Sequence, residues 1–521
     1  MERLISRIDT VAGRAIEGAM RAHHRRRLAG LGRLEQLDPP QDGRLWCAGS
    51  PAPRPGCQLD VLVDGEAALS QIADTIEGAR SHVHVAGWHL EPNFELRRAG
   101  GGGGDGPAKA ANLRELLAEL AERVEVKVLA WAGAPLPVFT PSRAEVRRTR
   151  EQLVAGTRIA CALDQRERPM HCHHEKLVIV DDEVAFVGGI DLTSLGGDRY
   201  DSSEHPLRPK LGWHDVATRL RGPAVADVAE HFRARWREVA GDGAAAGAVP
   251  GQPGAVQGQP GVVPGQRDAV PAQRDVMPGQ PGAGRRVELQ VVRTVPEKIY
   301  GFAPRGEFRI LEAYTRALRS AQRLVYLESQ FLWSPQIVDI LAAKLREPPD
   351  ERFRVVVLLP AKPNNGADTT RGQLGVLAAA DDGGKRFLAA TVSSRTNGER
   401  GPLYVHAKVG IVDDRWLTIG SANLNDHSLF NDTEMNVVVC DETLARETRL
   451  RLWSEHLELA VDEVAGEPSR VVDELWRPIA VEQLRRRERG EPATHRLTEL
   501  PGVSRRSMSL LGPVQGLLVD G

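Results

Sequence analysis

Two segments of the 521-residue chain repeat one pattern of chemically capable residues, a histidine, a lysine two positions later and an aspartate five positions after that. The residues that share this spacing are His174, Lys176 and Asp181 in the first segment and His406, Lys408 and Asp413 in the second. A lysine neutralises phosphate oxygens, and a neutral imidazole attacks phosphorus or carries a proton. The pattern therefore indicates phosphoryl chemistry, present in two copies.

The local sequence predicts that each histidine and lysine lie on one face of a strand, because side chains two positions apart point the same way. Each segment continues into a turn of small residues, Gly188-Gly189 or Gly420-Ser421, which we expect to let the backbone approach a ligand. A zinc site in the run His171-Cys172-His173-His174 is the alternative. Adjacent strand residues face opposite ways, and no second pair of ligands at zinc-like spacing is evident, which disfavours zinc.

The elements that must position these residues alternate between strands and helices. We expect strands at 59–63, 82–88 and 124–131 with helices at 67–79 and 113–123, and later strands at 287–292, 324–328 and 354–359 with helices at 308–321 and 337–345. Such alternation predicts an α/β fold.

A Gly/Pro/Gln-rich heptapeptide repeat divides the chain, and its composition predicts a disordered linker or long surface loop. We expect five parts: a basic amphipathic N-terminal arm (1–56), an N-terminal lobe (57–243), the linker (244–285), a C-terminal lobe (286–470) and a C-terminal tail (471–521). Residues 1–28 form a helix that lies on an anionic membrane or packs on the protein's own surface.

Composition restricts the partners and the compartment. Lys plus Arg is 68 and Asp plus Glu is 70, so the net charge of −2 provides no overall basic field for nucleic acid. The five scattered cysteines argue against a disulfide framework. No apolar run reaches the ~20 residues of a transmembrane helix, and no signal peptide is evident. We expect a cytoplasmic monomer, with peripheral contact to a membrane through the arm.

The two segments resemble the signature of the phospholipase D superfamily, H-x-K-x4-D-x6-G-[GS]-x-[ND], and both fit it completely. Flanking sequences such as Trp213-His214-Asp215 match as well, and they look more like the phosphatidylcholine-type phospholipases D than the cardiolipin synthases. The resemblance covers residues 59–458 without the linker. It implies two duplicated lobes, each a mixed β-sheet flanked by helices, packed as a pseudo-twofold unit around one phosphate.

That resemblance also implies the roles of the residues. His174 would be the nucleophile that forms a phosphohistidine, and His406 would protonate the leaving alcohol and then activate water. The phosphate-binding residues it implies are Lys176, Lys408 and Asn423. The first copy has Asp191 where the second has Asn423, and since a carboxylate repels phosphate we expect supporting roles for Asp191 and Ser421. The implied mechanism needs no metal and no cofactor.

Each histidine needs a partner that fixes its tautomer. The motif aspartates, Asp181 and Asp413, lie seven residues beyond their histidines, or roughly 23 Å along a strand, so we expect structural roles for them.

The resemblance implies that acidic residues after the small-residue turns orient the histidines. Glu434 follows His406 by 434 − 406 = 28 residues, and Asp201 follows His174 by 201 − 174 = 27. We therefore expect Glu434 to orient His406 and Asp201 to orient His174.

Taken together, the sequence predicts a phospholipase D that releases phosphatidic acid from a phospholipid substrate and can transfer the phosphatidyl group to another alcohol. A cardiolipin synthase-like phosphatidyltransferase is the alternative. A nuclease or other phosphodiesterase is less favoured, and no nucleic-acid partner is expected. A non-catalytic binding protein is disfavoured because both motifs are intact.

Overall fold

The structure is a computed structural model that describes residues 2–98, 111–135, 140–168, 171–241, 285–363 and 367–500, with the side chains of the first helix described from residue 17. The expected linker at 244–285 lies outside the described residues except for Arg285, which begins a strand.

A sheet of 16 strands runs through the whole molecule, and its order divides it into two equivalent halves. From the centre outward, the N-terminal half contains β1 (Arg54–Val63), β10 (Val216–Arg221), β8 (Val184–Gly188), β7 (Leu177–Val180), β2 (His82–Gly87), β5 (Glu125–Trp131) and β6 (Ala160–Asp164). The C-terminal half contains β11 (Arg285–Val295), β21 (Glu434–Val439), β20 (Trp416–Gly420), β19 (Val409–Val412), β13 (Leu324–Glu328), β14 (Arg354–Leu358) and β15 (Phe387–Thr391).

The two halves also agree in strand direction. In each half the central pairs are antiparallel and the last three strands are parallel, which makes each a mixed sheet. Antiparallel pairing of β1 with β11 joins them at the centre. The predicted pair of mixed-sheet lobes is therefore confirmed, and the lobes share one continuous sheet.

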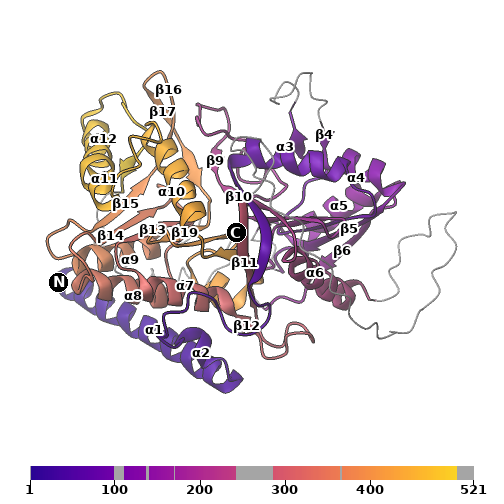
Figure 1. Cartoon of the computed structure of the whole chain (residues 1–521), viewed down its shortest axis with the longest axis horizontal. Coiled ribbons are helices and arrows are strands. Elements are labelled where there is room, and N and C mark those ends of the chain that lie inside the picture. The colour runs from indigo at the N-terminus through magenta and orange to yellow at the C-terminus, as the bar shows by residue number, and fades with distance from the viewer. Residues whose placement is uncertain are drawn as a thin grey trace, which may run out of the picture.

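Helices cover both faces of this sheet. In the N-terminal half these are α3 (Asp64–Glu77), α4 (Leu113–Ala121), α5 (Arg143–Val154) and α6 (Val225–Ala240), and in the C-terminal half α7 (Arg309–Ser320), α8 (Pro335–Arg346), α9 (Ala367–Ala380) and α10 (Glu442–Leu457). A half-turn about the viewing direction of Figure 1 exchanges the places of α3 and α7, and of α6 and α10. The arrangement is a pseudo-twofold duplication, as predicted.

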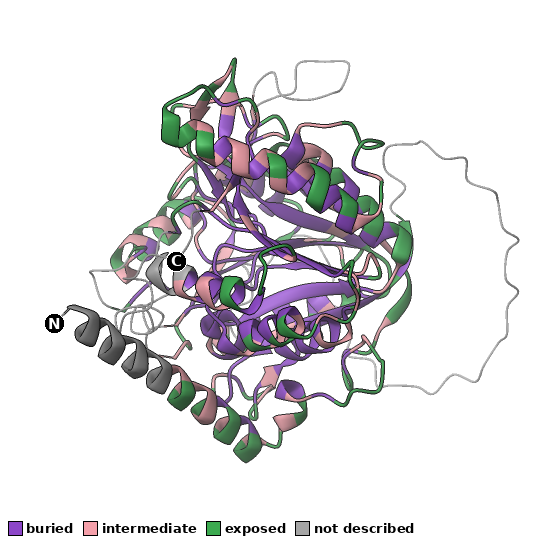
Figure 2. Ribbon diagram, turned by 90° about the vertical axis from the view of Figure 1, so that its left-hand side faces the viewer, coloured by how far each residue is buried: buried purple, intermediate pink, exposed green. Residues whose placement is uncertain are grey.

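One continuous apolar core spans both halves. It contains Phe232 of α6 and Trp453 of α10 together with strand residues of both halves, such as Ile179 and Ile411. Two further clusters fill the opposite face, one in each half. Figure 2 shows the buried strands between helices that expose only their outer sides.

The expected tail is part of the C-terminal half as far as residue 499. Trp476 and Leu497 are fully buried in the common core, and β22 (Thr498–Glu499) pairs with β15. Helix α11 (Pro468–Val471) precedes Trp476, and α12 (Arg477–Arg489) follows it. The lobe therefore extends beyond the predicted boundary at residue 470, because these apolar side chains complete its core.

The N-terminal arm packs on the C-terminal half from residue 17 onward. Helix α1 (Glu2–Leu31) places Leu28 in the core of that half and stacks His24 on Phe430, with 3.9 Å between the ring centroids. The guanidinium of Arg27 donates two hydrogen bonds to Glu297, at 2.9 and 2.7 Å. A short helix, α2 (Leu34–Leu37), follows. No helix in the described part of the chain is both long and apolar enough to cross a bilayer.

The motif aspartates sit in the two hairpin turns, β7–β8 and β19–β20. The central turn residues of both hairpins have positive φ, between 52° and 55°, as tight hairpins require. The carboxylate of Asp181 accepts hydrogen bonds from the backbone N–H groups of Arg80, Ser81 and His82, at 2.8–3.0 Å. Asp413 accepts from the backbone N–H groups of Gln322, Arg323 and Leu324, each at 2.8 Å. The aspartates thus fasten each hairpin to the start of the neighbouring strand.

Replacing Asp181 by alanine is expected to lower the free energy of unfolding by about 1–3 kcal/mol, because three N–H groups lose their acceptor. Urea denaturation measures this loss. Burial raises the pKa of Asp181, but the three N–H donors lower it to about 2. The difference in the free energy of unfolding between the wild type and the variant is therefore fully present above the ordinary pKa of 3.8. It decreases as the pH falls toward 2.

Glu183 of the same turn provides the control. Its carboxylate pairs on the surface with Arg80, and both side chains are more than half exposed. Glu183→Ala is expected to change the stability by less than about 0.5 kcal/mol. Equal losses in the two variants would contradict the role assigned to Asp181.

Candidate functional site

Each motif histidine lies beside a segment of the other half. The backbone N–H of His174, just before β7, donates to the carbonyl of Thr433 at 2.9 Å. The backbone N–H of His406, just before β19, donates to the carbonyl of His214 at 2.8 Å. This second contact continues the parallel pairing of β9 (Gly212–His214) with β18 (Leu403–Val405). The two motifs therefore meet where the halves interlock.

Carboxylates orient both imidazoles, and the pairing crosses between the halves. The Nδ1 atom of His174 lies 3.1 Å from a carboxylate oxygen of Glu434 and 3.1 Å from the backbone carbonyl of Ser421. The Nδ1 atom of His406 lies 2.6 Å from a carboxylate oxygen of Asp215. Both histidines are at most 5% exposed. With Nδ1–H donated to a carboxylate, each imidazole keeps its Nε2 lone pair for chemistry.

The expected pairing of Glu434 with His406 and of Asp201 with His174 is therefore wrong. Glu434 orients the histidine of the other half, and the carboxylate of Asp201 accepts a hydrogen bond from Arg208 at 2.9 Å.

Strand register explains this error. The first glycine of each turn has an equivalent partner on the adjacent strand: Gly188 pairs with Ala217, and Gly420 pairs with Asn436. Asp215 lies two residues before Ala217, and Glu434 lies two residues before Asn436. Asp215 and Glu434 are therefore equivalent residues of the two halves. The first half has a longer connection, 215 − 188 = 27 residues against 434 − 420 = 14, so counting residues from the histidine misses Asp215. Comparing the strands of the two halves would have found it.

The small-residue turns make room for side chains of the adjacent strand. A Cβ atom on Gly189 would lie 2.1 Å from a carboxylate oxygen of Asp215, and one on Gly420 would lie 2.1 Å from the side-chain oxygen of Asn436. Contacts this short are forbidden by van der Waals repulsion. The glycines therefore admit polar side chains of the adjacent strand, including the carboxylate that orients His406.

Both motif lysines are buried beside their histidines. Lys176 is 5% exposed and Lys408 is fully buried. The Lys176 ammonium donates to the carbonyl of His174 at 2.8 Å and forms an ion pair with Asp191 at 3.2 Å. Lys408 donates to the carbonyl of His406. Asp191 thus places a negative charge beside Lys176.

Two serines hold the Glu434 carboxylate in place. Ser428 donates to one oxygen at 2.6 Å, and the hydroxyl of Ser421 donates to the other. Burial raises the pKa of Glu434 well above its ordinary value. Asn423, in the equivalent position to Asp191, donates to the side-chain oxygen of Gln330 at 3.3 Å.

Positive charges surround His406. Burial lowers the pKa of His406 well below its ordinary value, and the charges of Lys408 and Arg199 lower it further. Burial also raises the pKa of Asp215, to about 6. Arg199 belongs to no sequence motif, and its guanidinium lies 3.7 Å from the centroid of Trp213. The Trp213 ring in turn lies 4.5 Å from the ring of His406, so this arginine adds a third buried cation to the two lysines.

The run from His171 to His174 does not form a common metal site. Nδ1 of His171 lies 2.9 Å from Nδ1 of His427, and Nε2 of His173 lies 3.1 Å from Asp164. In the described part of the chain, neither His174 nor His406 belongs to a group of side chains arranged around a metal position.

Sequence models of two related domain families match the chain. The model described as Phospholipase D matches residues 75–212, and the model described as Cardiolipin synthase, PLD-like domain matches residues 314–454. Together they cover more than half of the chain and contain both motifs.

Curated relatives are similar but longer. Phospholipase D2 of Bos taurus is 24% identical, over 75% of this chain and 50% of its own length. Phospholipase D alpha 4 of Arabidopsis thaliana is 25% identical, over 76% of this chain and 64% of its own length. The chain thus spans about half to under two thirds of these relatives. The solved phosphatidylserine synthase of Haemophilus influenzae Rd KW20 is 12% identical with a TM-score of 0.46, over 76% of this chain and 86% of its own.

The crossed pairing predicts the histidine tautomers. In protein labelled with ¹⁵N-histidine, both His174 and His406 are expected to carry the proton on Nδ1, because a carboxylate accepts it. Replacing Asp215 by asparagine is expected to shift His406 toward the Nε2–H tautomer, because an amide can donate to Nδ1. Glu434→Gln is expected to shift His174 the same way but less, because the carbonyl of Ser421 still accepts from Nδ1. Long-range ¹H–¹⁵N spectra distinguish the tautomers.

Asp201→Asn is the matched control, since that carboxylate belongs to the pairing expected from sequence. It is expected to leave the His174 signals unchanged. A tautomer change at His174 in Asp201→Asn, without one in Glu434→Gln, would refute the crossed arrangement.

Proposed function

Because the chain belongs to the phospholipase D superfamily, we propose that it cleaves the distal phosphodiester bond of a phospholipid, yielding phosphatidic acid and the head-group alcohol. The observation that carries this proposal is the crossed pair of buried histidines. Each imidazole has its Nδ1 atom fixed by a carboxylate of the other half, with three buried cations beside them. Two oriented imidazoles and a cationic pocket are what a two-step displacement at phosphorus requires.

In the first step, Nε2 of His174 attacks phosphorus. A nitrogen–phosphorus bond forms, the bond to the head-group oxygen breaks, and His406 gives that oxygen a proton. His406 must be protonated for this, although its pKa in the free site is low. The negative charge of a bound phosphodiester offsets the positive charge of the nearby cations and raises the pKa of His406. His406 therefore takes up its proton when the substrate binds.

In the second step, His406 removes a proton from water, and the resulting nucleophile breaks the nitrogen–phosphorus bond. Phosphatidic acid leaves and His174 is restored. An alcohol in place of water gives transphosphatidylation by the same route. Lys176, Lys408 and Arg199 neutralise the phosphate oxygens in both steps, and Asn423 adds a neutral donor. The proposed reaction uses no cofactor.

The competing activities differ in the acceptor or the substrate. A cardiolipin synthase-like phosphatidyltransferase would use the same intermediate and a lipid alcohol as acceptor. A nuclease is disfavoured because the net charge of −2 offers no general attraction for a phosphate backbone. Since both halves of the site come from one chain, we propose a monomer.

Incubation with phosphatidylcholine and ethanol is expected to produce phosphatidylethanol and choline, because ethanol competes with water for the phosphohistidine. Lipid mass spectrometry measures the products. His174→Asn and His406→Asn are each expected to reduce turnover by about 10²–10⁴-fold or more. With a radiolabelled phosphatidyl ester of p-nitrophenol, whose leaving group needs no proton, His406→Asn is expected to accumulate label on the protein and His174→Asn is not.

His23→Asn, a change at an exposed histidine on α1, is the control and should retain full turnover. Plasmid cleavage without any phospholipid product would refute the lipase proposal, and transfer only to phosphatidylglycerol would favour the phosphatidyltransferase. Label on His406 in place of His174 would reverse the two roles.

We also propose that the start of the arm makes peripheral contact with anionic lipid and that the protein is cytoplasmic. In the described part of α1, Arg25 and Arg27 already pair with Asp38 and Glu297, and Arg21 pairs with Asp339. Arg26 is exposed and belongs to none of these pairs, and Arg3, Arg7 and Arg14 precede it in the arm. We propose that these last three arginines contact the lipid.

Changing these three arginines to glutamine is expected to weaken flotation with phosphatidylglycerol-containing vesicles roughly 100-fold at low salt, since each basic residue contributes about 1 kcal/mol at an anionic surface. Turnover of a water-soluble short-chain substrate should be unchanged. Arg25→Gln is the control, because its charge is already neutralised by Asp38. If the triple variant floats as well as the wild type, the arm does not bind lipid and only packs on the protein's own surface.

A further inference from the structure

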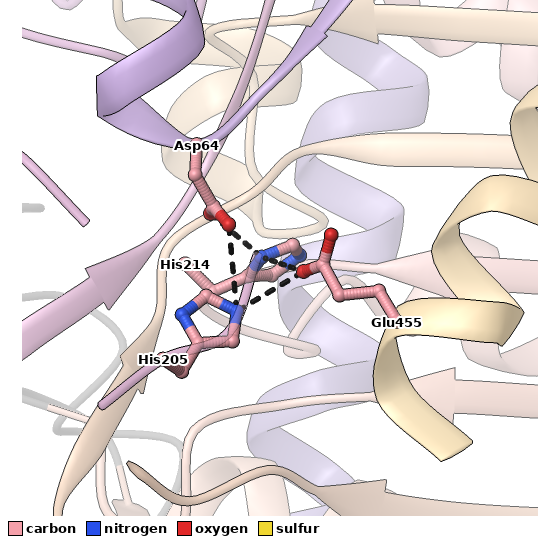
Figure 3. Close-up of side chains that lie close together, drawn as sticks. All are labelled: Asp64, His205, His214 and Glu455. Carbon is pink, nitrogen blue, oxygen red and sulfur yellow. Dashed lines mark hydrogen bonds and ion pairs between the residues drawn. The ribbon is translucent and has the colours of Figure 1, made fainter. Parts of the chain in front are cut away.

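Four buried side chains from distant parts of the chain meet behind His406. We name them the Asp64 cluster: Asp64, His205, His214 and Glu455. Asp64 begins α3, His214 ends β9, and Glu455 comes from α10 of the other half. Figure 3 shows the two imidazoles and the two carboxylates pointing into the same space. None of the four takes part in the proposed reaction.

The nitrogen–oxygen distances in the cluster match those between ligands of a tetrahedral metal ion. Nε2 of His205 lies 3.0 Å from Oε1 of Glu455 and 3.4 Å from Oδ2 of Asp64. Nδ1 of His214 lies 3.0 Å from Oδ1 of Asp64 and 3.5 Å from Oε1 of Glu455. Nitrogen and oxygen ligands about 2.0–2.1 Å from a tetrahedral zinc ion are roughly 3.3 Å apart. We propose that the Asp64 cluster binds one Zn²⁺ ion, which ties the two halves together and positions Asp215.

The other ring nitrogens of the two histidines face carboxylates. Nε2 of His214 lies 2.9 Å from Glu328, and Nδ1 of His205 lies 3.3 Å from Asp201. Histidines that bind metal commonly present their second nitrogen to a carboxylate, which fixes the tautomer and makes the imidazole a better ligand. Both histidines here have this arrangement, and each directs its remaining nitrogen into the cluster.

Burial and charge favour a dication at this position. The Asp64 side chain is 1% exposed, and one of its carboxylate oxygens is buried without a hydrogen-bond donor. Two further carboxylates, of Asp201 and Glu328, lie directly behind the histidines. Arg208 pairs with Asp201. The carboxylates of Asp64, Glu455 and Glu328 lie beside the two imidazoles, and one Zn²⁺ ion balances much of their negative charge.

The ligand types select the metal. Mg²⁺ and Ca²⁺ prefer shells of oxygen atoms, with six or more ligands. Two imidazole nitrogens and two carboxylate oxygens in a closed, four-ligand arrangement suit Zn²⁺. A closed shell of protein ligands also indicates a structural ion, because no position remains for water or substrate.

The position of the cluster gives the ion its function. Asp215, which orients His406, directly follows His214. The Asp64 carboxylate accepts a hydrogen bond from the backbone N–H of Asp215 at 3.1 Å, and the Asp64 N–H donates to the Asp215 carbonyl at 2.8 Å. An ion that joins Asp64 and His214 to Glu455 therefore fixes the backbone of Asp215 against the C-terminal half.

The test is metal analysis of the full chain, purified without a metal-affinity tag or chelator. Mass spectrometry of the elements is expected to find one zinc per chain, and a strong chelator is expected to remove it and lower the melting temperature. Glu455→Gln and His205→Gln are expected to lose the ion. Asp201→Asn, which leaves all four ligands in place, is expected to weaken zinc binding about 10–100-fold.

Two variants serve as matched controls. Glu447→Gln makes the same change at an exposed site of α10, and His171→Gln alters the separate group of His171, His427 and Asp432. Both are expected to keep zinc. If Glu455→Gln fails to fold, cobalt substitution of the wild type tests the site, since Co²⁺ there is expected to show the visible spectrum of a tetrahedral complex.

Three outcomes would overturn the proposal. The first is a wild-type protein that contains no zinc and whose melting temperature is the same with chelator, with added zinc and with neither. That result would make the cluster a network of protonated histidines. The second is zinc retained in both Glu455→Gln and His205→Gln. The third is zinc lost in His171→Gln while the Asp64 cluster variants keep it.

Discussion

The antiparallel pairing of β1 with β11 at the centre of the sheet sets Cys57 opposite Val287 and relates the two halves by a half-turn. Such a relation brings equivalent segments of the halves face to face, so the segment before one motif strand lies against the other half. Each histidine then finds its carboxylate across the boundary, Glu434 for His174 and Asp215 for His406. Two copies of one motif thereby become a single site.

That site concentrates charge where water is excluded, which is costly unless every charge has a partner. Here the charged groups have partners close to them. Lys176 pairs with Asp191, two serines hold Glu434, and the guanidinium of Arg199 stacks on Trp213. The rigid sheet keeps these groups in place before a substrate arrives, so little rearrangement is needed when charge develops on phosphate.

Local patterns predicted much of this arrangement. Apolar runs located strands such as β13, and the repeated spacing identified the histidines, the lysines and the duplication. The crossing was not predictable from spacing, because a longer loop in the first half shifts Asp215 and only strand register reveals its equivalence to Glu434. Arg199 and the Asp64 cluster were missed for the same physical reason: residues as distant as 64 and 455 become neighbours only through tertiary packing. The buried tail shows that apolar residues near a chain end can belong to the core.

The crossed carboxylates also bear on biosynthesis, since a ribosome delivers the chain from its N-terminus. His174 is synthesised long before Glu434, and Asp215 is synthesised long before His406. A nascent N-terminal half therefore contains neither complete pair of histidine and orienting carboxylate. Helix α1 is made before Glu297 and Phe430, which hold its end. A chain that stops between the two halves therefore carries one motif without its orienting carboxylate, and the proposed phosphodiester chemistry requires synthesis to have passed Glu434.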